Sequence, residues 1–485
     1  MYLCTLKIIG MTGQKTPTAL GTEKIGKLLM QYAIPAIIAM TASSLYNMVD
    51  SIFIGQGVGP LAISGLAITF PLMNLSAAFG AAVGVGASTF ISVKLGQKDY
   101  DTAKHILGNT MTLNLITGLG VGLVCLLFLD PILRFFGASD QTIPYARDYM
   151  VIILLGNVIT HMYFGLNAVL RAAGKPKHAM SATIFTVVLN TLLDPLFIYT
   201  FGLGIKGAAY ATVLAQSLAL IWQLYIFSRP KELLHFKRGT FRLQSSIIRN
   251  IIAIGLSPFS MNVCACIVVI LINNSMVHYG SDLAVGAYGI ANKVAFIFVM
   301  INMGVNQGMQ PIAGYNYGAM RYDRLMKVVK YSIIAATAIM TTGFIIAMTI
   351  PGPCARLFTT DPTLIDLSAK GIRYIMVAFP VVGYQMVVSN FFQSIGKAKI
   401  SIVLSLSRQL LILLPLLLVL PTMFGINGVW VSMPVSDTLS AFMAAWIMIV
   451  HMRKFKKQHN EITNEQKVID NKQKQLTNKQ KDTNL

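Results

Sequence analysis

Acidic residues are scarce in this chain of 485 residues, and glutamate is the scarcest of them. Glutamate occurs only at positions 23, 232, 461 and 465, and charged residues of both signs make up 12% of the sequence. Soluble domains contain about 25% charged residues, so this composition excludes an ordinary soluble domain. The sequence also lacks a P-loop, a nucleophile motif and a His/Glu metal cluster, and we therefore expect it not to be an enzyme.

The five cysteines do not indicate a metal site. Cys264 and Cys266 are two residues apart, which places them on different faces of a helix. Cys4, Cys125 and Cys354 have no neighbour at metal-ligand spacing. We interpret all five as small apolar side chains.

Hydrophobic residues, in contrast, make up 55% of the chain. About 20 consecutive apolar residues cross a bilayer core, and windows of this kind between charged breaks number twelve. These windows predict an all-α polytopic membrane protein with spans at 26–48, 62–85, 105–129, 149–170, 179–200, 207–228, 249–276, 284–308, 327–350, 371–392, 400–420 and 427–450.

The two halves of the chain repeat each other. Residues 283–323 match 61–101 without a gap when they are shifted by 222 positions, and Gly174-Lys175 matches Gly396-Lys397 at the same offset. Six spans per half return the chain to its starting side, so the halves are parallel repeats, an arrangement typical of transporters. We therefore expect a cytoplasmic N-terminus (1–25), an N-terminal six-helix lobe (26–228), a cytoplasmic inter-lobe linker (229–248), a C-terminal six-helix lobe (249–450) and a basic cytoplasmic tail (451–485) whose Gln-, Asn- and Lys-rich composition predicts disorder.

The formal charge of +21 is distributed unevenly. Most of the 39 Lys and Arg residues lie in the two termini and in the loops that follow the second, fourth, sixth, eighth and tenth spans. Positive charge keeps loops on the cytoplasmic side, so this pattern predicts that both termini are cytoplasmic. This distribution of charge accounts for the net positive charge of the chain without a nucleic-acid partner, which we exclude.

Two acidic residues, Asp194 and Asp437, lie inside the predicted spans, and Asp50 lies at the end of the first span. An acid in hydrocarbon costs about 3 kcal/mol on insertion scales, so each needs a reason. Asn190 and Asp194 are four residues apart and share one helix face, Pro195 bends the helix beside them, and Thr212 follows in the next span. We interpret this group of oxygens as a site for a proton or an alkali cation, with a structural acid as the alternative.

Asp50 lies near the outer end of the first span, where it either snorkels to the surface or faces Asp194. The repeat places Asn273 opposite Asp50, and Pro415 and Leu416 opposite Asp194. Because only the N-terminal half keeps these acids, we expect cation coupling to reside there.

Asp437 stands one span after Arg408, and we expect a structural ion pair between them. Lys293 is a lone cation in the eighth span. It either lines an aqueous cavity or neutralises Asp437.

Several motifs of the predicted spans occur together: Pro35, Asp50-Ser51-Ile52-Phe53-Ile54-Gly55, Gly84-Val85-Gly86-Ala87, Leu95-Gly96, Leu170-Arg171-Ala172-Ala173-Gly174, Asn190 to Asp194-Pro195, and Gly207-Ala208-Ala209 before Thr212. Together they resemble the multidrug and toxic compound extrusion (MATE) family, closest to its DinF-like and MepA-like bacterial branch. The resemblance covers roughly residues 26–450.

This resemblance implies two six-helix bundles in a V around a cavity that opens alternately to each side. It also implies a multi-pass protein of the bacterial cytoplasmic (inner) membrane that exports bulky, often cationic and aromatic drugs or toxic organic cations. In that branch the positions of Asp50, Asn190, Asp194 and Thr212 form the cation site. The acids of the seventh and tenth spans, which hold Na⁺ in the NorM-like branch, are missing here.

We expect no cofactor, a monomer in the lipid bilayer, and coupling to H⁺ rather than Na⁺, because burial favours the protonated form of a carboxylic acid. A Na⁺ site at the same four residues is the alternative. The 26 Met residues and the aromatic side chains suit varied cargo. Candidate cavity residues, each alternatively part of ordinary packing, are Tyr46, Met73, Met162, Tyr163, Tyr384 and Gln385.

A lipid-linked oligosaccharide or lipid flippase of related architecture is the main alternative function. Such a protein normally carries several cationic residues in its cavity, whereas only Lys293 and Arg408 lie in the middle of a span here, and the other Lys and Arg residues of the spans stand at the span ends. A channel is a weaker alternative, since lone acids and two halves suit alternating access better.

Overall fold

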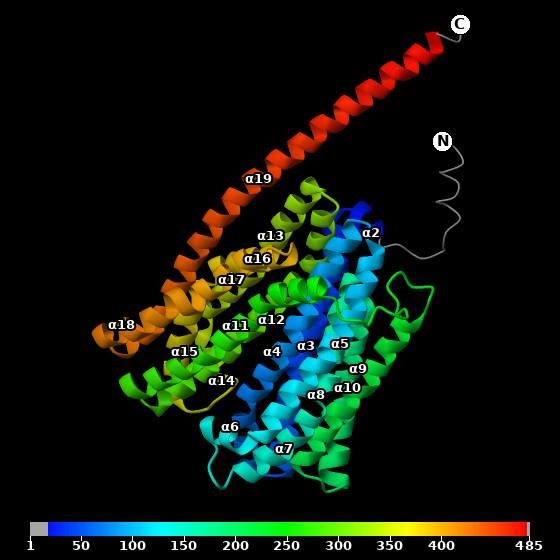
Figure 1. Cartoon of the computed structure of the whole chain (residues 1–485). Helices are drawn as coiled ribbons and strands as arrows, with labels where there is room; N and C mark the ends of the chain where they lie inside the picture. The colour runs from blue at the N-terminus through cyan, green and yellow to red at the C-terminus, as the bar shows by residue number, and fades with distance from the viewer. Residues whose placement is uncertain (1–17, 483–485) are drawn as a thin grey trace.

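The long apolar windows of the sequence form helices that cross the molecule in two groups (Figure 1). The computed structural model describes residues 18–482, and this range contains ten helices long and apolar enough to span a membrane. Two further spans are helix pairs bent by 57° and 48°. The described chain therefore has up to twelve spans, as the sequence predicts.

The N-terminal half begins with the short α2 and contains six spans. Its elements are α2 (Thr18–Thr22), α3 (Ile25–Gly57), α4 (Pro60–Gly96), α5 (Tyr100–Leu127), α6 (Leu129–Phe135), the bent pair α7 (Ile143–Leu155) and α8 (Asn157–Ala172), α9 (Pro176–Pro195) with the π-helical η1 (Leu196–Thr200), and α10 (Ile205–Ser228).

The C-terminal half repeats this order. Its elements are α11 (Ser245–Tyr279), α12 (Asp282–Gly318), α13 (Tyr322–Thr349), α14 (Pro351–Arg356), the bent pair α15 (Pro362–Met376) and α16 (Phe379–Ser394), α17 (Ala398–Leu406) with η2 (Ser407–Leu413) and α18 (Leu414–Phe424), and α19 (Ile426–Asp482).

The tail differs from the prediction of disorder. Helix α19 does not end with the last span but continues as one helix to Asp482, beyond the bundle (Figure 1). Phe455 explains the start of this extension, because its buried ring stacks on Tyr322 and meets Phe391 edge-on. Lys and Gln, which are common in the tail, also favour helix.

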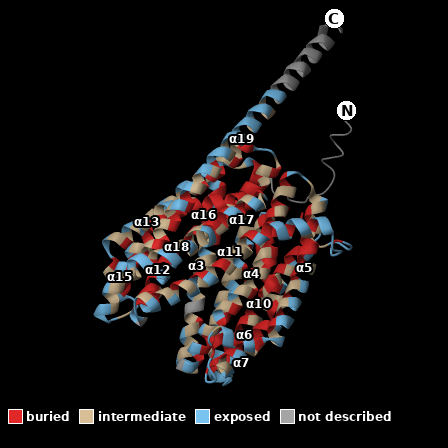
Figure 2. Ribbon diagram, turned by 60° about the vertical axis from the view of Figure 1, so that its left-hand side comes forward, coloured by how far each residue is buried: buried red, intermediate tan, exposed pale blue. Residues whose placement is uncertain are grey.

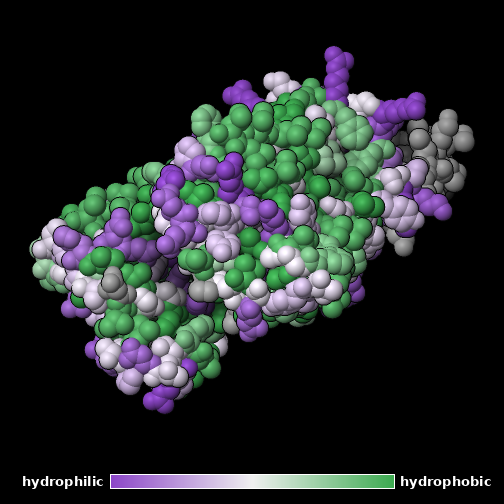
Figure 3. Space-filling model, turned by 90° about the horizontal axis from the view of Figure 1, so that it is seen from below, coloured by the Kyte–Doolittle hydropathy of each residue, from purple (hydrophilic) through white to green (hydrophobic). Residues whose placement is uncertain are grey.

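Each half has apolar cores between its helices, and large apolar side chains also cover much of the outer surface (Figure 2, Figure 3). Leu119, Leu123 and Phe128 are among the exposed ones. Soluble monomers rarely expose so much contiguous apolar surface, whereas a protein surrounded by lipid does.

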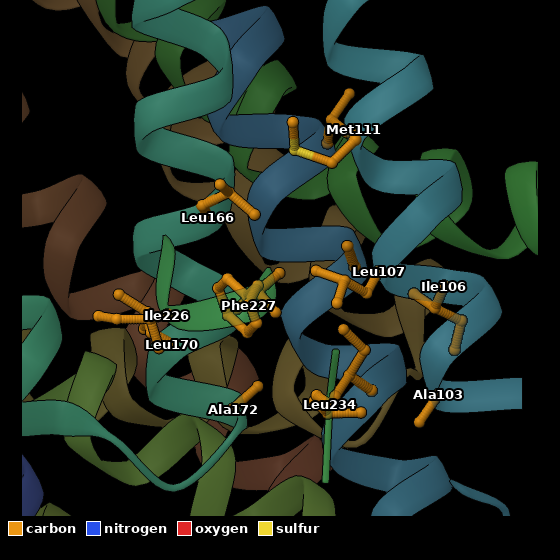
Figure 4. Close-up of a cluster of buried hydrophobic side chains, with 14 of the residues drawn as sticks. Ala103, Ile106, Leu107, Met111, Leu166, Leu170, Ala172, Ile226, Phe227 and Leu234 are labelled. Carbon is orange, nitrogen blue, oxygen red and sulfur yellow. The ribbon is translucent and has the colours of Figure 1, made fainter. Parts of the chain in front are cut away.

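The division by packing does not follow the division by sequence. The first half of α3 carries Leu28 and Tyr32 into the core of the C-terminal lobe, against α13, α16 and α19. The first half of α11 carries Ile247 and Ile251 into the core of the N-terminal lobe. Leu234, from the connection between α10 and α11, enters the same core (Figure 4). The predicted boundaries at 26–228 and 249–450 thus describe the repeat but not the two packed bodies, which exchange the starts of α3 and α11.

The lobes touch at the end of the molecule where α2 and the extension of α19 lie. Here α4 and α12 approach so closely that a Cβ on Gly96 would lie 2.0 Å from the carbonyl oxygen of Tyr315, and one on Gly318 would lie 2.0 Å from that of Val93. The two contacts are related by the 222-residue repeat. In the same interface the Gln310 amide donates to the hydroxyls of Ser88 at 3.0 Å and of Thr89 at 2.8 Å. Seen from the opposite end, the molecule is hollowed between the lobes (Figure 3).

Candidate cation-coupling site

Asp194 and Asn190 lie one turn apart near the end of α9, inside the N-terminal lobe. Both side chains are buried, and the Asn190 amide donates a hydrogen bond of 2.6 Å to Asp194 Oδ1. Asp194 Oδ2 is also buried and has no hydrogen-bond partner. The helix changes to π-helical form directly after Pro195, a feature that often marks functional sites.

Thr212 on α10 and Tyr46 on α3 continue this hydrogen-bonded group. The Thr212 hydroxyl donates to Asn190 Oδ1 at 3.2 Å, and the Tyr46 and Thr212 oxygens lie 2.9 Å apart. Because a hydroxyl has one proton to donate, Tyr46 must be the donor to Thr212. Tyr46, which the sequence suggested for the substrate cavity, therefore belongs to this cluster.

Asp50 on α3 faces the same cluster and does not snorkel to the surface. Its side chain is 5% exposed, its Oδ1 has no hydrogen-bond partner, and its charge acts on Asp194. Within the described part of the chain, neither carboxyl takes part in an ion pair. The fold thus places two buried acids together, and no cationic side chain that the structure describes pairs with either of them.

Tyr149 on α7 is a member of the cluster that sequence reasoning missed. It is fully buried, interacts with the Thr212 hydroxyl, and lies close enough for Asp50 and Asp194 to act on it. Tyr149 stands at the edge of its predicted span, and nothing in the local sequence distinguishes it. Only the packing of α7 against α10 brings it to the acids.

The other in-span charges lie elsewhere. Arg408 Nε and Asp437 Oδ1 form an ion pair at 2.6 Å in the C-terminal lobe, as the sequence predicts. Lys293 lies 5.9 Å from the centre of the Phe358 ring and does not neutralise Asp437. Because Arg408 already balances Asp437, this pair has no need of a coupling ion.

The remaining candidates for the substrate cavity do not form one group. Tyr163 and Gln385 are buried inside different lobes, which corrects the expectation that they line a shared cavity. Met73, Met162 and Tyr384 are partly buried and pack against the cores of their own lobes. The spacing of these residues predicted membership of spans but not the direction in which each side chain points.

The cluster has few groups for a transition metal. The described residues contain no set of three or more His, Cys, Asp or Glu side chains that could hold a metal ion. What the site offers is two carboxyls, an amide and hydroxyls, and this donor set suits a proton or a hard monovalent cation.

The MatE family model matches the chain twice, over residues 35–196 and 258–419. The chain belongs to the MATE family. The two matches begin and end with the same spacing, as expected for the repeat, and each covers the first five spans of its lobe.

Curated relatives and solved structures agree with this membership. Over 426 residues the chain is 28% identical to the multidrug export protein MepA of Staphylococcus haemolyticus, with 88% of this chain and 94% of the relative covered. It is 27% identical over 427 residues to MepA of Staphylococcus aureus, with the same coverage.

Among solved structures, the MATE fold of this chain superposes on a MATE transporter in the straight conformation with a TM-score of 0.85 at 26% identity, over 92% of this chain and 99% of the other. The bent conformation gives 0.86 at 25% identity with the same coverage. An outward-facing MATE family transporter of the MOP superfamily gives 0.86 at 24% identity, over 91% of this chain and 99% of the other, and supports the fold. The resemblance inferred from the motifs and the all-α, two-lobe fold class are both confirmed.

Proposed function

We propose that this MATE protein exports bulky, often cationic aromatic compounds in exchange for H⁺, by alternating access across a bacterial cytoplasmic membrane. The observation that carries the proposal is the pair of buried carboxyl oxygens, Asp50 Oδ1 and Asp194 Oδ2, that have no partner. A buried polar atom without a partner costs free energy, and two unbalanced negative charges cost more. A proton taken up and released at this place removes that cost in one state of the cycle.

The hydrogen bonds inside the cluster favour H⁺ over Na⁺. Asn190 Oδ1 accepts from Thr212, and Thr212 in turn accepts from Tyr46. The amide and hydroxyl oxygens are therefore already engaged in hydrogen bonds with each other, whereas Asp50 Oδ1 and Asp194 Oδ2 are not. What remains unsatisfied is carboxyl oxygen, which a proton satisfies with a single bond.

The substrate class and the orientation rest on other observations. The MepA relatives are named multidrug export proteins, and the molecule is hollowed between the lobes, where cargo would bind (Figure 3). The clustering of Lys and Arg supports a cytoplasmic position for the end that carries α2 and the extension of α19. In this structure the lobes would then be closed toward the cytoplasm. Arg408 forms an ion pair with Asp437 and is therefore not available to bind an anionic substrate. This leaves few unpaired cationic side chains in the spans, which disfavours a flippase.

Purified protein in vesicles with ethidium tests the proposal. A pH gradient without Na⁺ should drive transport, and a protonophore should abolish it. A Na⁺ gradient at equal pH and constant membrane potential should not drive it. Transport that instead requires Na⁺ under these conditions would reject the proton mechanism.

A further inference from the structure

A line of polar side chains leaves the carboxyl cluster and runs through the interior of the N-terminal lobe. On α9, Thr183 is eleven residues before Asp194 on the same helix face, about 16 Å away along the helix. On α10, Gln216 and Gln223 follow Thr212 at spacings that also keep one face. On α8, the members of the matching face are Thr160, Tyr163, Asn167 and Arg171.

These faces meet and form hydrogen bonds across the three helices. Thr160 donates to Gln216 Oε1 at 2.6 Å, and Gln216 lies one turn after Thr212 on α10. The Asn167 amide donates to the Thr183 hydroxyl at 3.2 Å, and Thr183 donates to a backbone carbonyl. Tyr163 interacts with Thr183 and lies between these two levels. We call this set, from Thr212 to Arg171, the polar column.

The end of the column lies near the side that carries α2. Arg171 donates to Asn167 Oδ1 and is the last polar member on α8, two residues before the chain leaves the helix. Its side chain is partly exposed. The column therefore runs from the buried acids to the end of α8, on the side that we propose is cytoplasmic.

Packing alone does not explain this arrangement. The surroundings are apolar, with Leu166, Leu170 and Phe227 among the buried neighbours (Figure 4). Gln223 is completely buried, and neither its amide nitrogen nor its oxygen has a partner. An amide of this kind in a polar line is a natural place for water, since buried waters satisfy such groups.

The repeat shows how the C-terminal lobe differs. At the offset of 222, Ser389 and Ser405 replace Asn167 and Thr183, so the inner part stays polar. At the outer end, Leu416 replaces Asp194. In the N-terminal lobe the polar face leads to acids that have no ion-pair partner among the described residues, whereas Asp437, the buried acid of the C-terminal lobe, is paired with Arg408.

We propose that the polar column carries the proton between the Asp50–Asp194 cluster and the cytoplasm, so that release occurs through the inside of the lobe and not through the hollow between the lobes. This inference rests on the proposed function. Hydroxyl groups both donate and accept, and waters held by the amides complete the relay. One proton leaves a carboxyl, passes along the column and enters bulk water, and no other bond changes.

Coupling requires that the acids do not reach both sides at once. Both carboxyls are buried here, and the bond from Tyr46 on α3 to Thr212 closes the cluster on the side of that helix. A movement of α3 would open the cluster on that side, whereas the polar column would connect the cluster to the cytoplasmic side.

The test separates proton release from movement of the substrate. Thr183→Val replaces one hydroxyl by a methyl, and Gln216→Leu removes an amide; both are compared with the wild type in vesicles. Uptake of ethidium driven by a pH gradient should fall at least tenfold. Exchange of ethidium at equal pH needs no net proton movement and should stay within about twofold of the wild type.

Controls make the outcome specific. Thr438→Val, the position opposite Gln216 in the C-terminal lobe, should leave both rates unchanged, and Thr183→Ser should restore driven uptake. Driven uptake at the wild-type rate in Thr183→Val and Gln216→Leu would overturn the inference, as would an equal loss of both rates. If Gln216→Leu does not fold, the comparison of Thr183→Val with Thr183→Ser decides the question. A wild type that shows no proton-driven uptake would refute the proposed function, and the inference with it.

Discussion

Gly318→Ala should weaken the contact that closes the lobes on the side of α2. The added Cβ would lie 2.0 Å from the carbonyl oxygen of Val93, and Cβ atoms in proteins keep at least 3.0 Å from such an atom. The obstacle is backbone, which cannot rotate away as a side chain would. Helices α4 and α12 must therefore separate by about 1 Å, or the lobes must part.

Overpacking of a tight contact costs about 1–3 kcal/mol. If the open form of this interface does not bear the cost, the ratio of closed to open molecules falls by about 5- to 150-fold, since 1.4 kcal/mol corresponds to a factor of ten. Gly318→Ala should thus shift the protein away from the conformation described here. The change does not require loss of fold, because the residue lies at the last position of α12 and not in a lobe core.

Spin labels at Asp101→Cys and Lys327→Cys, in a background without the five native cysteines, would measure the separation of the two lobes. Gly318→Ala should add or enlarge a long-distance population. Gly120→Ala is the matched control, because a Cβ there meets nothing within 4 Å. A distance distribution for Gly318→Ala that equals those of the wild type and of Gly120→Ala would refute the reasoning.

Three further predictions concern the charged groups. Asp194→Asn should leave expression intact and abolish gradient-driven efflux, because the proton then has no carboxyl to bind; wild-type efflux in vesicles would contradict this. Asp50→Asn should severely reduce drug resistance in cells at matched expression and Asn273→Ala only mildly, and the reverse order would place coupling in the C-terminal lobe. Arg408→Met should destabilise the protein by about 2 kcal/mol, less than the 3–5 kcal/mol of a fully buried pair because the arginine is partly exposed, and Asp437→Leu in addition should recover most of the loss of thermal stability in detergent.

The membrane class, the twelve spans and the family could be predicted from the sequence because each depends on local pattern. Apolar length decides whether a segment spans a bilayer, and the 222-residue offset needs only comparison of the chain with itself. The i, i+4 spacing of Asn190 and Asp194 predicted their shared face, and the structure joins them by a hydrogen bond. The scarcity of acids likewise distinguishes Asp50 in the sequence alone.

Contacts between distant segments could not be predicted in this way. Tyr149 lies about 100 residues from Asp50 in sequence, and Tyr46 meets Thr212 only because α3 packs beside α9 and α10. Tyr163 and Gln385 were expected at a cavity, yet the rotation of their helices turns both inward. Helix periodicity fixes which residues share a face, but tertiary packing decides which face points to the core.

The sequence by itself determined that this protein is a duplicated bundle of membrane helices in which the acids Asp50 and Asp194 have no acidic counterpart in the second half, since composition and comparison of the chain with itself suffice for both. The tertiary structure alone decided that α3 and α11 begin in the opposite lobe, that Gly96 and Gly318 bring α4 and α12 into backbone contact, and that the two acids share one buried cluster. The physical reason is that close packing selects among helix faces and partners that the local sequence leaves equally open.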